Sequence, residues 1–423
     1  MSITYKITPG STINGHINIP GDKSISHRSI MFAALAEGKT TITGLLEGED
    51  VLATLNAFRE MGVNIDKKDA GILEITGSGL YGLHAPKQSL YLGNAGTAMR
   101  LMAGLMAAQS FNTHLIGDDS LTQRPMDRVI KPLTEMGAVI SGRDKQYPPL
   151  NIAGNQQLSG IQYTLPVPSA QVKSCLLLAG VYAKGETTIT EPETTRDHTE
   201  KMLQAFGYPV TVAPNKISLT GGGKLTATNI KVPADISSAA FFIVAAILNP
   251  GADLLIKSVG INATRIGVIH ILKLMGADIQ CLNNKTWGKE PVADIRVKYS
   301  KLHGITIPKR FISLAIDEFP ILFIAAACAQ GVTRLTGAGE LRIKESDRIQ
   351  AMAEGLMTLG IQVKTMQDGI EITGGTMSGG CVESFHDHRI AMAFTIAGLR
   401  ASSVITVMNC DNVATSFPDF VSI

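Results

Sequence analysis

One kind of segment dominates the hydrophobic pattern of this chain: a stretch of almost wholly apolar or small residues that recurs six times. Each copy follows a short strand-like run and a polar cluster. A segment of this length that is apolar on all sides predicts a helix that is buried on every side. The copies are about 70 residues apart, a spacing closer to a small α/β module than to a solenoid repeat. They begin near Ser24, Gly96, Ser169, Ser237, Asp317 and Asp387.

Glycines mark two further places in this repeat. A Gly followed by a Thr- and Ile-rich strand comes after several of the apolar helices, at Gly38, Gly185 and Gly331. A second helix then ends in a bulky residue plus Gly, at Gly62, Gly137, Gly207, Gly276 and Gly360. Gly directly after a helix, with a β-rich segment beyond it, is a stop signal. The sixth copy lacks this second half because the sequence ends at Ile423, and we expect the segment Tyr5 to Ile19 to supply its missing strands.

The repeat predicts two lobes. Six helices that are apolar all round cannot share one ordinary core, and 423 residues exceed what one core usually supports. Three such helices can pack back to back inside each lobe, with sheets outside. The predicted crossovers are Ile19-Pro20-Gly21 and Val232-Pro233-Ala234, both strand ends rigidified by Pro. The predicted domains are therefore residues 1–20 plus 235–423, and residues 21–234.

Composition and charge exclude several classes of function. The chain is 45% hydrophobic and 17% charged, and its net charge of +2 gives no general attraction to nucleic acid or to a membrane surface. The longest apolar run, Ala239 to Leu248, is too short to span a bilayer, which takes about 20 residues. The five cysteines are scattered without a CxxC pair, and the N-terminus has no signal-peptide pattern. Reduced thiols in a cytoplasmic protein are expected.

The starts of the apolar helices carry the candidate chemistry. Lys23, Lys173 and Arg389 stand there, where free N–H groups and a partial positive charge suit a phosphate or a carboxylate. Asp235 and Ser237, at another start, are interpreted as N-caps. Capping does not explain Lys23 or Arg389, because a cation is unfavourable at a helix start unless an anion joins it. We therefore expect the helix starts to converge on one cleft that binds anions.

Two loops add further cations. One places Arg124 just before a Pro-rigidified helix start. The other, Leu341–Arg348, opens another predicted helix, which puts Lys344 and Arg348 four residues apart on one face with Glu345 beside them. A charged helical face alone usually indicates solvated surface, but these loops together with the helix starts indicate an anion site.

These residues lie in motifs that occur in the same order in a known family. The motifs are Pro20-Gly-Asp-Lys-Ser-Ile-Ser-His-Arg28, Gly93-Asn-Ala-Gly-Thr-Ala-Met-Arg100, Leu121 to Arg128, Pro168-Ser-Ala-Gln-Val-Lys173, Lys344-Glu-Ser-Asp-Arg348 and Ser384 to Arg389. On them the chain resembles the 5-enolpyruvylshikimate-3-phosphate synthase family over its whole length. The resemblance implies the enolpyruvyl transferase fold, a two-lobed inside-out α/β barrel. Each lobe has three βαβαββ repeats with helices inside and sheets outside, and the active site lies in the cleft between the lobes.

The resemblance also implies a reaction. Enzymes of this family transfer the enolpyruvyl group of phosphoenolpyruvate to the 5-hydroxyl of shikimate 3-phosphate and release phosphate, through a tetrahedral intermediate, in chorismate and aromatic amino acid biosynthesis. No cofactor and no metal are implied. The implied partners are the two small-molecule substrates, with no nucleic acid and no membrane, and the implied state is a monomer.

Individual roles follow from the motif positions, as the resemblance implies them. The residues that match the phosphoenolpyruvate site are Lys23, Gly96, Arg124, Arg348 and Arg389. The residues that match the shikimate 3-phosphate site are Ser24, Arg28, Ser169, Ala170, Gln171, Arg196, Asp317 and Lys344. The residues that match the catalytic groups are Asp317 on the 5-hydroxyl, Glu345 as the proton shuttle, and Lys23.

Two motifs look like the second class of this family: Ser169-Ala170-Gln171 and Arg196-Asp-His-Thr199. The chain departs from the first class at Thr415, where that class has a Lys that binds phosphoenolpyruvate, and Lys344 is the expected substitute. Enzymes of this family are the target of glyphosate. The resemblance implies that Gly96 leaves space at the phosphoenolpyruvate pocket, which suggests sensitivity to glyphosate, whereas second-class features often accompany tolerance.

Several other motifs in the chain resemble known sites but lack a feature that those sites require. Gly77–Gly82 fits GxGxxG but has a Pro and a second strand where a nucleotide-binding helix should begin, and Gly38-Lys39-Thr40 lacks the first Gly of a P-loop. His386 and His388 have poor spacing for one metal. The sister transferase that acts on UDP-N-acetylglucosamine typically has a Cys in the loop that here contains Arg124 and no Cys. A non-catalytic binding protein would need neither Asp317 nor Glu345.

Overall fold

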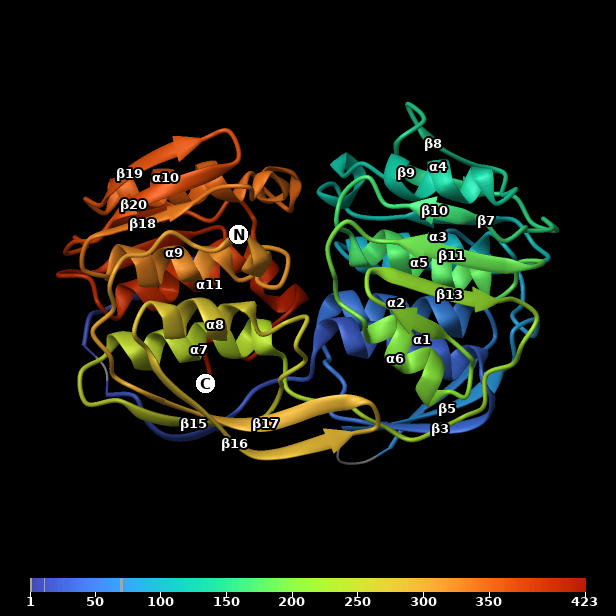
Figure 1. Ribbon diagram of the computed structural model, residues 1–423, viewed down its shortest axis with the longest axis horizontal. Helices are drawn as coiled ribbons and strands as arrows, with labels where there is room; N and C mark the ends of the chain where they lie inside the picture. The colour runs from blue at the N-terminus through green and yellow to red at the C-terminus, as the bar shows by residue number, and fades with distance from the viewer. Residues whose placement is uncertain (1, 11, 69–70) are drawn as a thin grey trace. The chain divides into compact units, whose positions relative to one another are not determined.

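Strands and helices alternate along the chain in the computed structural model, which describes residues 2–10, 12–68 and 71–423. The chain divides into two compact units. Unit 1 comprises Met1–Pro20, Pro233–Thr286 and Glu290–Ile423, and unit 2 comprises Gly21–Val232 with Trp287–Lys289. Each unit contains three separate sheets of three or four strands, and none of the sheets in the described ranges closes on itself (Figure 1).

Two stretches of unit 2 show the repeating module in full. The elements of the first are β6 (Leu90–Tyr91), α3 (Gly96–Met106), β7 (Thr113–Ile116), α4 (Asp127–Glu135), β8 (Ile140–Arg143) and β9 (Tyr147–Ile152). The elements of the second are β10 (Gln162–Thr164), α5 (Ala170–Gly180), β11 (Glu186–Thr190), α6 (His198–Ala205), β12 (Thr211–Ala213) and β13 (Lys216–Thr220). Both are βαβαββ modules, and their strand orders, β6-β7-β9-β8 and β10-β11-β13-β12, correspond position by position. In each module the first strand pair is parallel and the others are antiparallel.

The third module of unit 2 is assembled from both ends of its chain segment. Its elements are α1 (Lys23–Leu35), β3 (Glu37–Thr43), α2 (Glu49–Glu60), β4 (Asn64–Lys67), β5 (Ile72–Ser78) and β14 (Ile230–Lys231). The last of these, β14, takes the place of the missing first strand and pairs parallel to β3. The two glycine motifs set aside on sequence grounds lie in this sheet: Gly38 is in β3, and Gly77 pairs with it from β5. Neither opens a nucleotide-binding helix.

Unit 1 repeats the module with more irregular strands. Its elements are β1 (Tyr5–Ile7), β2 (Asn14–Asn18), α7 (Ile236–Leu248), β15 (Asp253–Gly260), α8 (Gly267–Leu274), β16 (Asp278–Trp287), β17 (Glu290–Lys298), η3 (Lys309–Phe311), α9 (Phe319–Ala327), β18 (Val332–Leu335), η4 (Gly339–Ile343), α10 (Arg348–Thr358), β19 (Gln362–Met366), β20 (Gly369–Thr373), β21 (Gly380–Glu383), α11 (His388–Gly398), β22 (Ile405–Met408) and η5 (Asp411–Thr415). The segment expected to complete the last repeat serves two sheets. β1 pairs antiparallel to β22 of that repeat, whereas β2 pairs parallel to β15 and completes the repeat that contains α7.

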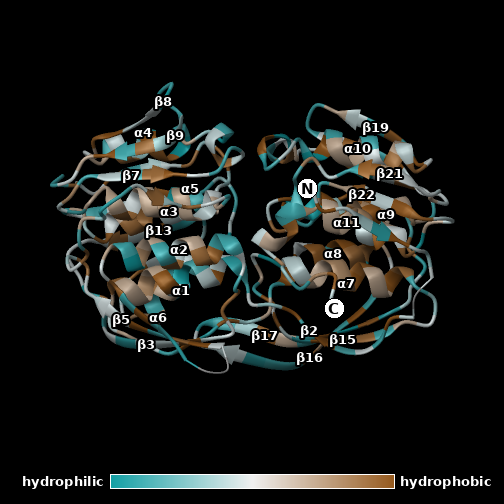
Figure 2. Ribbon diagram, turned by 180° about the vertical axis from the view of Figure 1, so that it is seen from behind, coloured by the Kyte–Doolittle hydropathy of each residue, from teal (hydrophilic) through white to brown (hydrophobic). Residues whose placement is uncertain are grey.

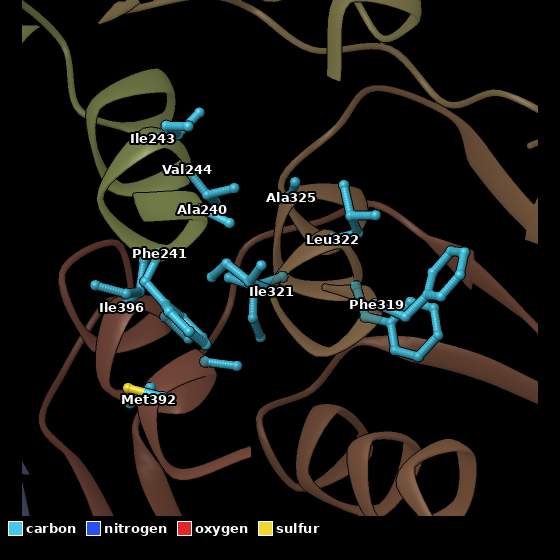
Figure 3. Packing of buried hydrophobic residues seen from close by; sticks show 14 of the residues in the cluster. Ala240, Phe241, Ile243, Val244, Phe319, Ile321, Leu322, Ala325, Met392 and Ile396 are labelled. Carbon is cyan, nitrogen blue, oxygen red and sulfur yellow. The ribbon is translucent and has the colours of Figure 1, made fainter. Parts of the chain in front are cut away.

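All six apolar segments form buried helices, as the hydrophobic pattern predicts. These helices are α1, α3, α5, α7, α9 and α11. In unit 1, α7, α9 and α11 pack against one another, and Figure 3 shows Phe241, Ile321 and Met392 turned toward the space that these three helices share. Hydrophobic residues predominate in α7 and α8 in Figure 2. The sides of these buried helices are largely apolar. Polar side chains are therefore concentrated at the first residues of the helices.

Each second helix of a module ends at the predicted glycine. Gly62, Gly137, Gly207, Gly276 and Gly360 all have positive φ, between 79° and 101°. At each of them two backbone N–H groups return to carbonyls of the last helical turn, as in Gly62 N to Arg59 O (2.9 Å) and Val63 N to Phe58 O (3.1 Å). This is the Schellman arrangement, which is strained for residues with a side chain and open to Gly.

Candidate active site

In unit 2 the first group of predicted residues lies at the start of α1. The carboxylate of Asp22 caps this helix by accepting a hydrogen bond from the backbone N–H of Ile25 at 2.8 Å. Lys23, the first helical residue, forms an ion pair with Asp50 in the first turn of α2. Asp50 is buried, whereas the side chain of Lys23 keeps 21% of its surface exposed. The carboxylate of Asp50 thus offsets the unfavourable position of the Lys23 charge at a helix start. The sequence did not predict this ion pair, because an acidic residue in the first turn of a helix is common and Asp50 is distant from Lys23 in the chain.

Arg28 lies one turn further along α1 and is buried. Its guanidinium donates to Thr199 Oγ1 of α6 (2.7 Å), to Ser174 Oγ of α5 (2.8 Å) and to the backbone carbonyl of Ser24 (3.0 Å). These bonds fix the guanidinium plane against three helices. Ser174 and Thr199 are contacts to which the motifs gave no role. The signal in the sequence for Ser174 is a polar residue inside the largely apolar α5, whereas Thr199 ends the Arg196–Thr199 motif and lies in the polar helix α6.

A second cation pair surrounds Gly96 at the start of α3. Arg124 is buried, and it donates to the backbone carbonyl of Asn94 at 3.2 Å and to Ser120 Oγ at 3.0 Å. A Cβ on Gly96 would lie 2.9 Å from Nη1 of Arg100 and 3.3 Å from Nη1 of Arg124. Any side chain at position 96 would therefore press on two guanidinium groups, which gives a physical reason for Gly there.

The start of α5 is tied to the start of α3. Ser169 caps α5 through Val172 N at 3.3 Å, and Ala170 is the first helical residue. Gln171 accepts from Arg100 Nη1 (2.8 Å) and donates to Thr97 Oγ1 (3.0 Å). Arg196 is half-buried in the loop between β11 and α6. Unit 2 thus brings the starts of its buried helices into direct hydrogen-bond contact.

In unit 1 the predicted residues gather around Arg348, the first residue of α10, whose side chain is 1% exposed. Its Nε lies 2.8 Å from Asp387 Oδ2, its Nη2 lies 2.7 Å from Glu345 Oε2, and its Nη1 lies 3.5 Å from Asp317 Oδ1. Burial acts to lower the pKa of Arg348, but the carboxylates, Asp387 foremost, raise it above its ordinary value. Burial likewise acts to raise the pKa of Asp387, yet the Arg348 charge holds it below its usual range. Both groups are therefore ionised.

Asp317 connects the other two cations of unit 1. Lys344 Nζ lies 3.3 Å from Asp317 Oδ1, and Arg389 Nη1 donates to the Asp317 backbone carbonyl at 3.0 Å. The buried carboxylate of Glu318 also approaches Arg389 Nη1, at 3.7 Å, and accepts a hydrogen bond from Ser237. The N-cap prediction is confirmed for Asp235, which accepts a hydrogen bond from the backbone N–H of Ser237 at 2.8 Å, but it is wrong for Ser237, whose hydroxyl donates to Glu318 instead of capping the helix.

One detail of the sequence prediction is wrong. Lys344 and Arg348 do not share a face of one helix, because η4 ends at Ile343 and α10 begins only at Arg348, capped by Asp347. Lys344 and Glu345 lie in the connection between the two. They meet Arg348 through the carboxylate contacts of Asp317 and Glu345 rather than through helical spacing.

Two further predicted positions have a clear environment. Thr415 ends η5 and is buried, with its hydroxyl donating to the Asn412 carbonyl at 2.7 Å. His386 is exposed on the turn before α11 with a φ of +55°, whereas His388 is buried in the first turn of that helix. The five cysteines are free thiols, as expected. In the part of the chain that the structure describes, no helix has the length and apolarity needed to cross a bilayer.

Nearly the whole chain, including these residues, matches known proteins. The profile of the family described as EPSP synthase (3-phosphoshikimate 1-carboxyvinyltransferase) matches residues 7–423. A 3-phosphoshikimate 1-carboxyvinyltransferase of Methylococcus capsulatus is 58% identical over 421 residues, covering 100% of this chain and 96% of the relative. One from Legionella pneumophila is 56% identical over 414 residues, covering 98% and 95%.

Solved structures agree. An EPSP synthase from Acinetobacter baumannii superposes with a TM-score of 0.89 at 57% identity, covering 99% of this chain and 97% of that one. The enolpyruvyl transferase NikO from Streptomyces tendae superposes with a TM-score of 0.81 at 16% identity, over 100% and 97%, and this likeness shows the fold alone. The enolpyruvyl transferase fold and the family predicted from the motifs are both confirmed. The chain belongs to the EPSP synthase (3-phosphoshikimate 1-carboxyvinyltransferase) family.

Proposed function

We propose that this protein transfers the enolpyruvyl group of phosphoenolpyruvate to the 5-hydroxyl of shikimate 3-phosphate and releases phosphate. The reaction is the one named by its relatives, at 56–58% identity over nearly the whole chain. The observation in the structure that supports it best is the cluster in unit 1. There two partly exposed carboxylates, Asp317 and Glu345, lie beside Lys344 and Arg348. This is the combination that an acid–base reaction on anionic substrates requires.

Phosphoenolpyruvate is assigned to Lys23, Arg124, Arg348 and Arg389, with Gly96 leaving room beside Arg124. Arginine suits the two-pronged geometry of carboxylate and phosphate, whereas lysine acts as a point charge. The buried Arg124 is already oriented by Asn94 and Ser120, so less side-chain freedom is lost on binding.

Shikimate 3-phosphate is assigned to a second set of predicted site residues, which come from both units. From unit 2 they are Ser24, Arg28, Ser169, Ala170, Gln171 and Arg196, and from unit 1 they are Asp317 and Lys344. The direct bonds between Gln171, Arg100 and Thr97 fix the start of α5 before any substrate arrives. Lys344, which lies 3.3 Å from Asp317 Oδ1, is further proposed to supply the positive charge that the neutral Thr415 lacks.

The proposed chemistry is addition followed by elimination. Protonation of C3 of phosphoenolpyruvate makes C2 electrophilic, and the 5-hydroxyl adds to C2 as it loses its proton. The tetrahedral adduct then expels phosphate while C3 gives up a proton, which restores the C2–C3 double bond. Asp317 is assigned to the hydroxyl proton and Glu345 to the proton at C3, with Lys23 beside the phosphoenolpyruvate. When Glu345 carries a proton it no longer neutralises Arg348 Nη2, which lies 2.7 Å away. Arg348 then offers more of its charge to the substrate carboxylate.

Electrostatics sets the scale of the binding problem. Each substrate carries a carboxylate and a phosphate, and one pair of like charges at ~4 Å costs about 4 kcal/mol at an effective dielectric of ~20. Several cations are needed to overcome that repulsion. General acid–base catalysis typically contributes about 10²–10⁴-fold, whereas positioning contributes up to roughly 7–11 kcal/mol. Orientation of the two substrates is therefore expected to contribute more than the proton transfers.

The proposal also covers the cellular location and the oligomeric state of the protein. We place it in the cytoplasm as a monomer, in keeping with five free thiols and with substrates that are small, charged metabolites. Size-exclusion chromatography with light scattering checks the monomer against the chain mass of 45.0 kDa.

A phosphate-release assay tests the function. The purified chain is given phosphoenolpyruvate together with either shikimate 3-phosphate or UDP-N-acetylglucosamine, and Asp317→Ala serves as the inactive control. We expect release only with shikimate 3-phosphate and only from the unaltered protein. Release with UDP-N-acetylglucosamine alone would assign the chain to the sister reaction, and release with neither acceptor would leave a binding protein.

A further inference from the structure

Lys173 is a helix-start cation for which the family motifs give no role, and the structure places it away from solvent. Its side chain is 1% exposed and lies between two buried carboxylates. Lys173 Nζ is 2.9 Å from Glu191 Oε1 and 2.7 Å from Glu200 Oε1. It also donates to the backbone carbonyl of Thr195 at 3.4 Å. A lysine enclosed in this way cannot bind a substrate anion directly.

These contacts join α5 and the loop that carries Arg196, both of which hold proposed substrate residues, to the helix α6. Lys173 lies on α5, four residues after Ser169 and two after Gln171. Glu191 and Thr195 belong to the loop that continues to Arg196, and the Thr195 hydroxyl donates to Glu191. Glu200 belongs to α6, which begins just after that loop. The cluster therefore fixes the position of the Arg196 loop relative to the start of α5.

A second set of hydrogen bonds, next to the ion pairs of Lys173, also joins α5 to α6. Ser174, next to Lys173, accepts a hydrogen bond from Thr199 Oγ1 at 2.7 Å, and Thr199 is next to Glu200. Arg28 of α1 donates to both of these hydroxyls, at 2.7 and 2.8 Å. Residues 173 and 174 of α5 are thus paired with residues 200 and 199 of α6, and α1 is tied to the same point.

The cluster of Lys173, Glu191 and Glu200 is not expected to contribute much to the free energy of unfolding. One lysine with two glutamates leaves an excess negative charge in the interior when all are ionised, and burial raises the pKa of Glu200 more than Lys173 lowers it. Within the described chain, Glu200 Oε2 is buried and has no hydrogen-bond partner. Buried ion clusters often contribute less to stability than apolar side chains of the same volume, but they impose one geometry.

We propose that Lys173, Glu191 and Glu200 are positioning residues that hold the Arg196 loop and the start of α5 in register for the phosphate group of shikimate 3-phosphate. The assignment rests on the proposed function. The three residues act through Arg196, Ser169, Gln171 and Arg28 and do not touch substrate. Their loss is therefore expected to weaken the binding of one substrate and to leave the other largely unaffected.

The test measures KM for each substrate separately, in the phosphate-release assay, for Lys173→Met and Glu191→Gln. We expect the KM for shikimate 3-phosphate to rise about tenfold or more, with the KM for phosphoenolpyruvate changed less than about threefold. Glu191→Gln keeps a neutral Lys173–Glu200 pair and decides the question if Lys173→Met does not fold. Lys131→Met, which removes an exposed lysine paired with Asp127 on α4, is the matched control and is expected to match the unaltered protein.

Each result has one meaning. Unchanged KM values in a folded variant, or equal increases for both substrates, overturn the positioning role. Failure of the unaltered protein to turn over shikimate 3-phosphate overturns the proposed function instead, so the two failures are distinguishable. Thermal melting of every variant, followed by circular dichroism, separates loss of folding from loss of binding.

Discussion

The buried carboxylate of Asp387 holds the unit 1 cluster together, so replacing it tests how that cluster is built. It accepts two hydrogen bonds from Arg348, at 2.8 and 3.2 Å, and one from Ser346 at 3.1 Å. It also caps α11 through the backbone N–H of Arg389 at 2.9 Å. One side chain therefore orients two of the proposed phosphoenolpyruvate cations.

The cost of removing Asp387 can be worked out from these contacts. Breaking a buried ion pair costs about 3–5 kcal/mol and losing an N-cap about 1 kcal/mol, so Asp387→Ala is expected to lose about 4–6 kcal/mol. For a unit of roughly 200 residues each kcal/mol lowers the Tm by about 2–4 °C, which predicts a fall of roughly 8–24 °C. Asp387→Asn keeps the cap and much of the shape, and is expected to lose about half as much.

The pH dependence has a definite sign. The pKa of Asp387 is lower in the folded protein than in the unfolded chain, so its contribution is fully present above the unfolded value of about 3.9. That contribution is lost as the pH falls below this value through the folded pKa. The Tm difference between the unaltered protein and Asp387→Asn should therefore shrink below about pH 4.

Differential scanning calorimetry between pH 3 and pH 7 measures both effects. Asp347→Ala is the matched control, because Asp347 caps α10 and pairs with Arg342 while remaining 39% exposed. Its expected loss is only about 1–2 kcal/mol. A loss for Asp387→Ala no larger than that of the control, or a Tm difference that persists unchanged at pH 3, would refute the reasoning.

Three further predictions concern activity. Asp317→Ala should lower kcat by about 10²–10⁴-fold while calorimetry still detects binding of shikimate 3-phosphate, and a fully active variant would remove Asp317 from the mechanism. Arg124→Ala should raise the KM for phosphoenolpyruvate about tenfold or more and that for shikimate 3-phosphate much less, whereas equal rises would contradict the assignment. Gly96→Ala brings a Cβ to 3.3 Å from Arg124 Nη1, so the KM for phosphoenolpyruvate and the inhibition constant of glyphosate should both rise by several-fold, and unchanged values would show that the pocket lies elsewhere.

The parts of the fold that sequence could predict are those encoded locally. Apolar residues on every side predict a buried helix, and a glycine after a second helix predicts where it ends, because φ near +90° excludes most other residues. Strand exchange is not encoded in this way. β2 and β14 are short strands that precede similar buried helices, and nothing in their residues states that β2 pairs with β15 while β14 pairs with β3. Parallel pairing between distant segments depends on the whole module.

The candidate site shows the same limit. Cations at helix starts could be recognised as candidate anion-binding residues because a helix start disfavours a positive charge. The motifs that contain these cations indicated the protein family. The sequence could not distinguish Lys23, which remains partly exposed, from Lys173, which is buried between two glutamates. The difference arises from Glu191 and Glu200, which come from a loop and from another helix. Lys344 was misplaced on a helical face because α10 begins only after Asp347, whose carboxylate caps it by accepting a hydrogen bond from the backbone N–H of Gln350.

The buried cluster in unit 2 leads to a final prediction that separates stability from function. Replacing Lys173, Glu191 and Glu200 together by apolar residues of similar volume, as in K173M/E191L/E200L, removes three desolvated charges and leaves none unpaired. Such replacements are often neutral or stabilising by about 1–4 kcal/mol. We therefore expect the triple variant to melt at or above the temperature of the unaltered protein, and yet to bind shikimate 3-phosphate about tenfold or more weakly because Thr195 and the Arg196 loop lose their anchor. A triple variant that is markedly less stable and has a normal KM would mean that the cluster serves the fold alone.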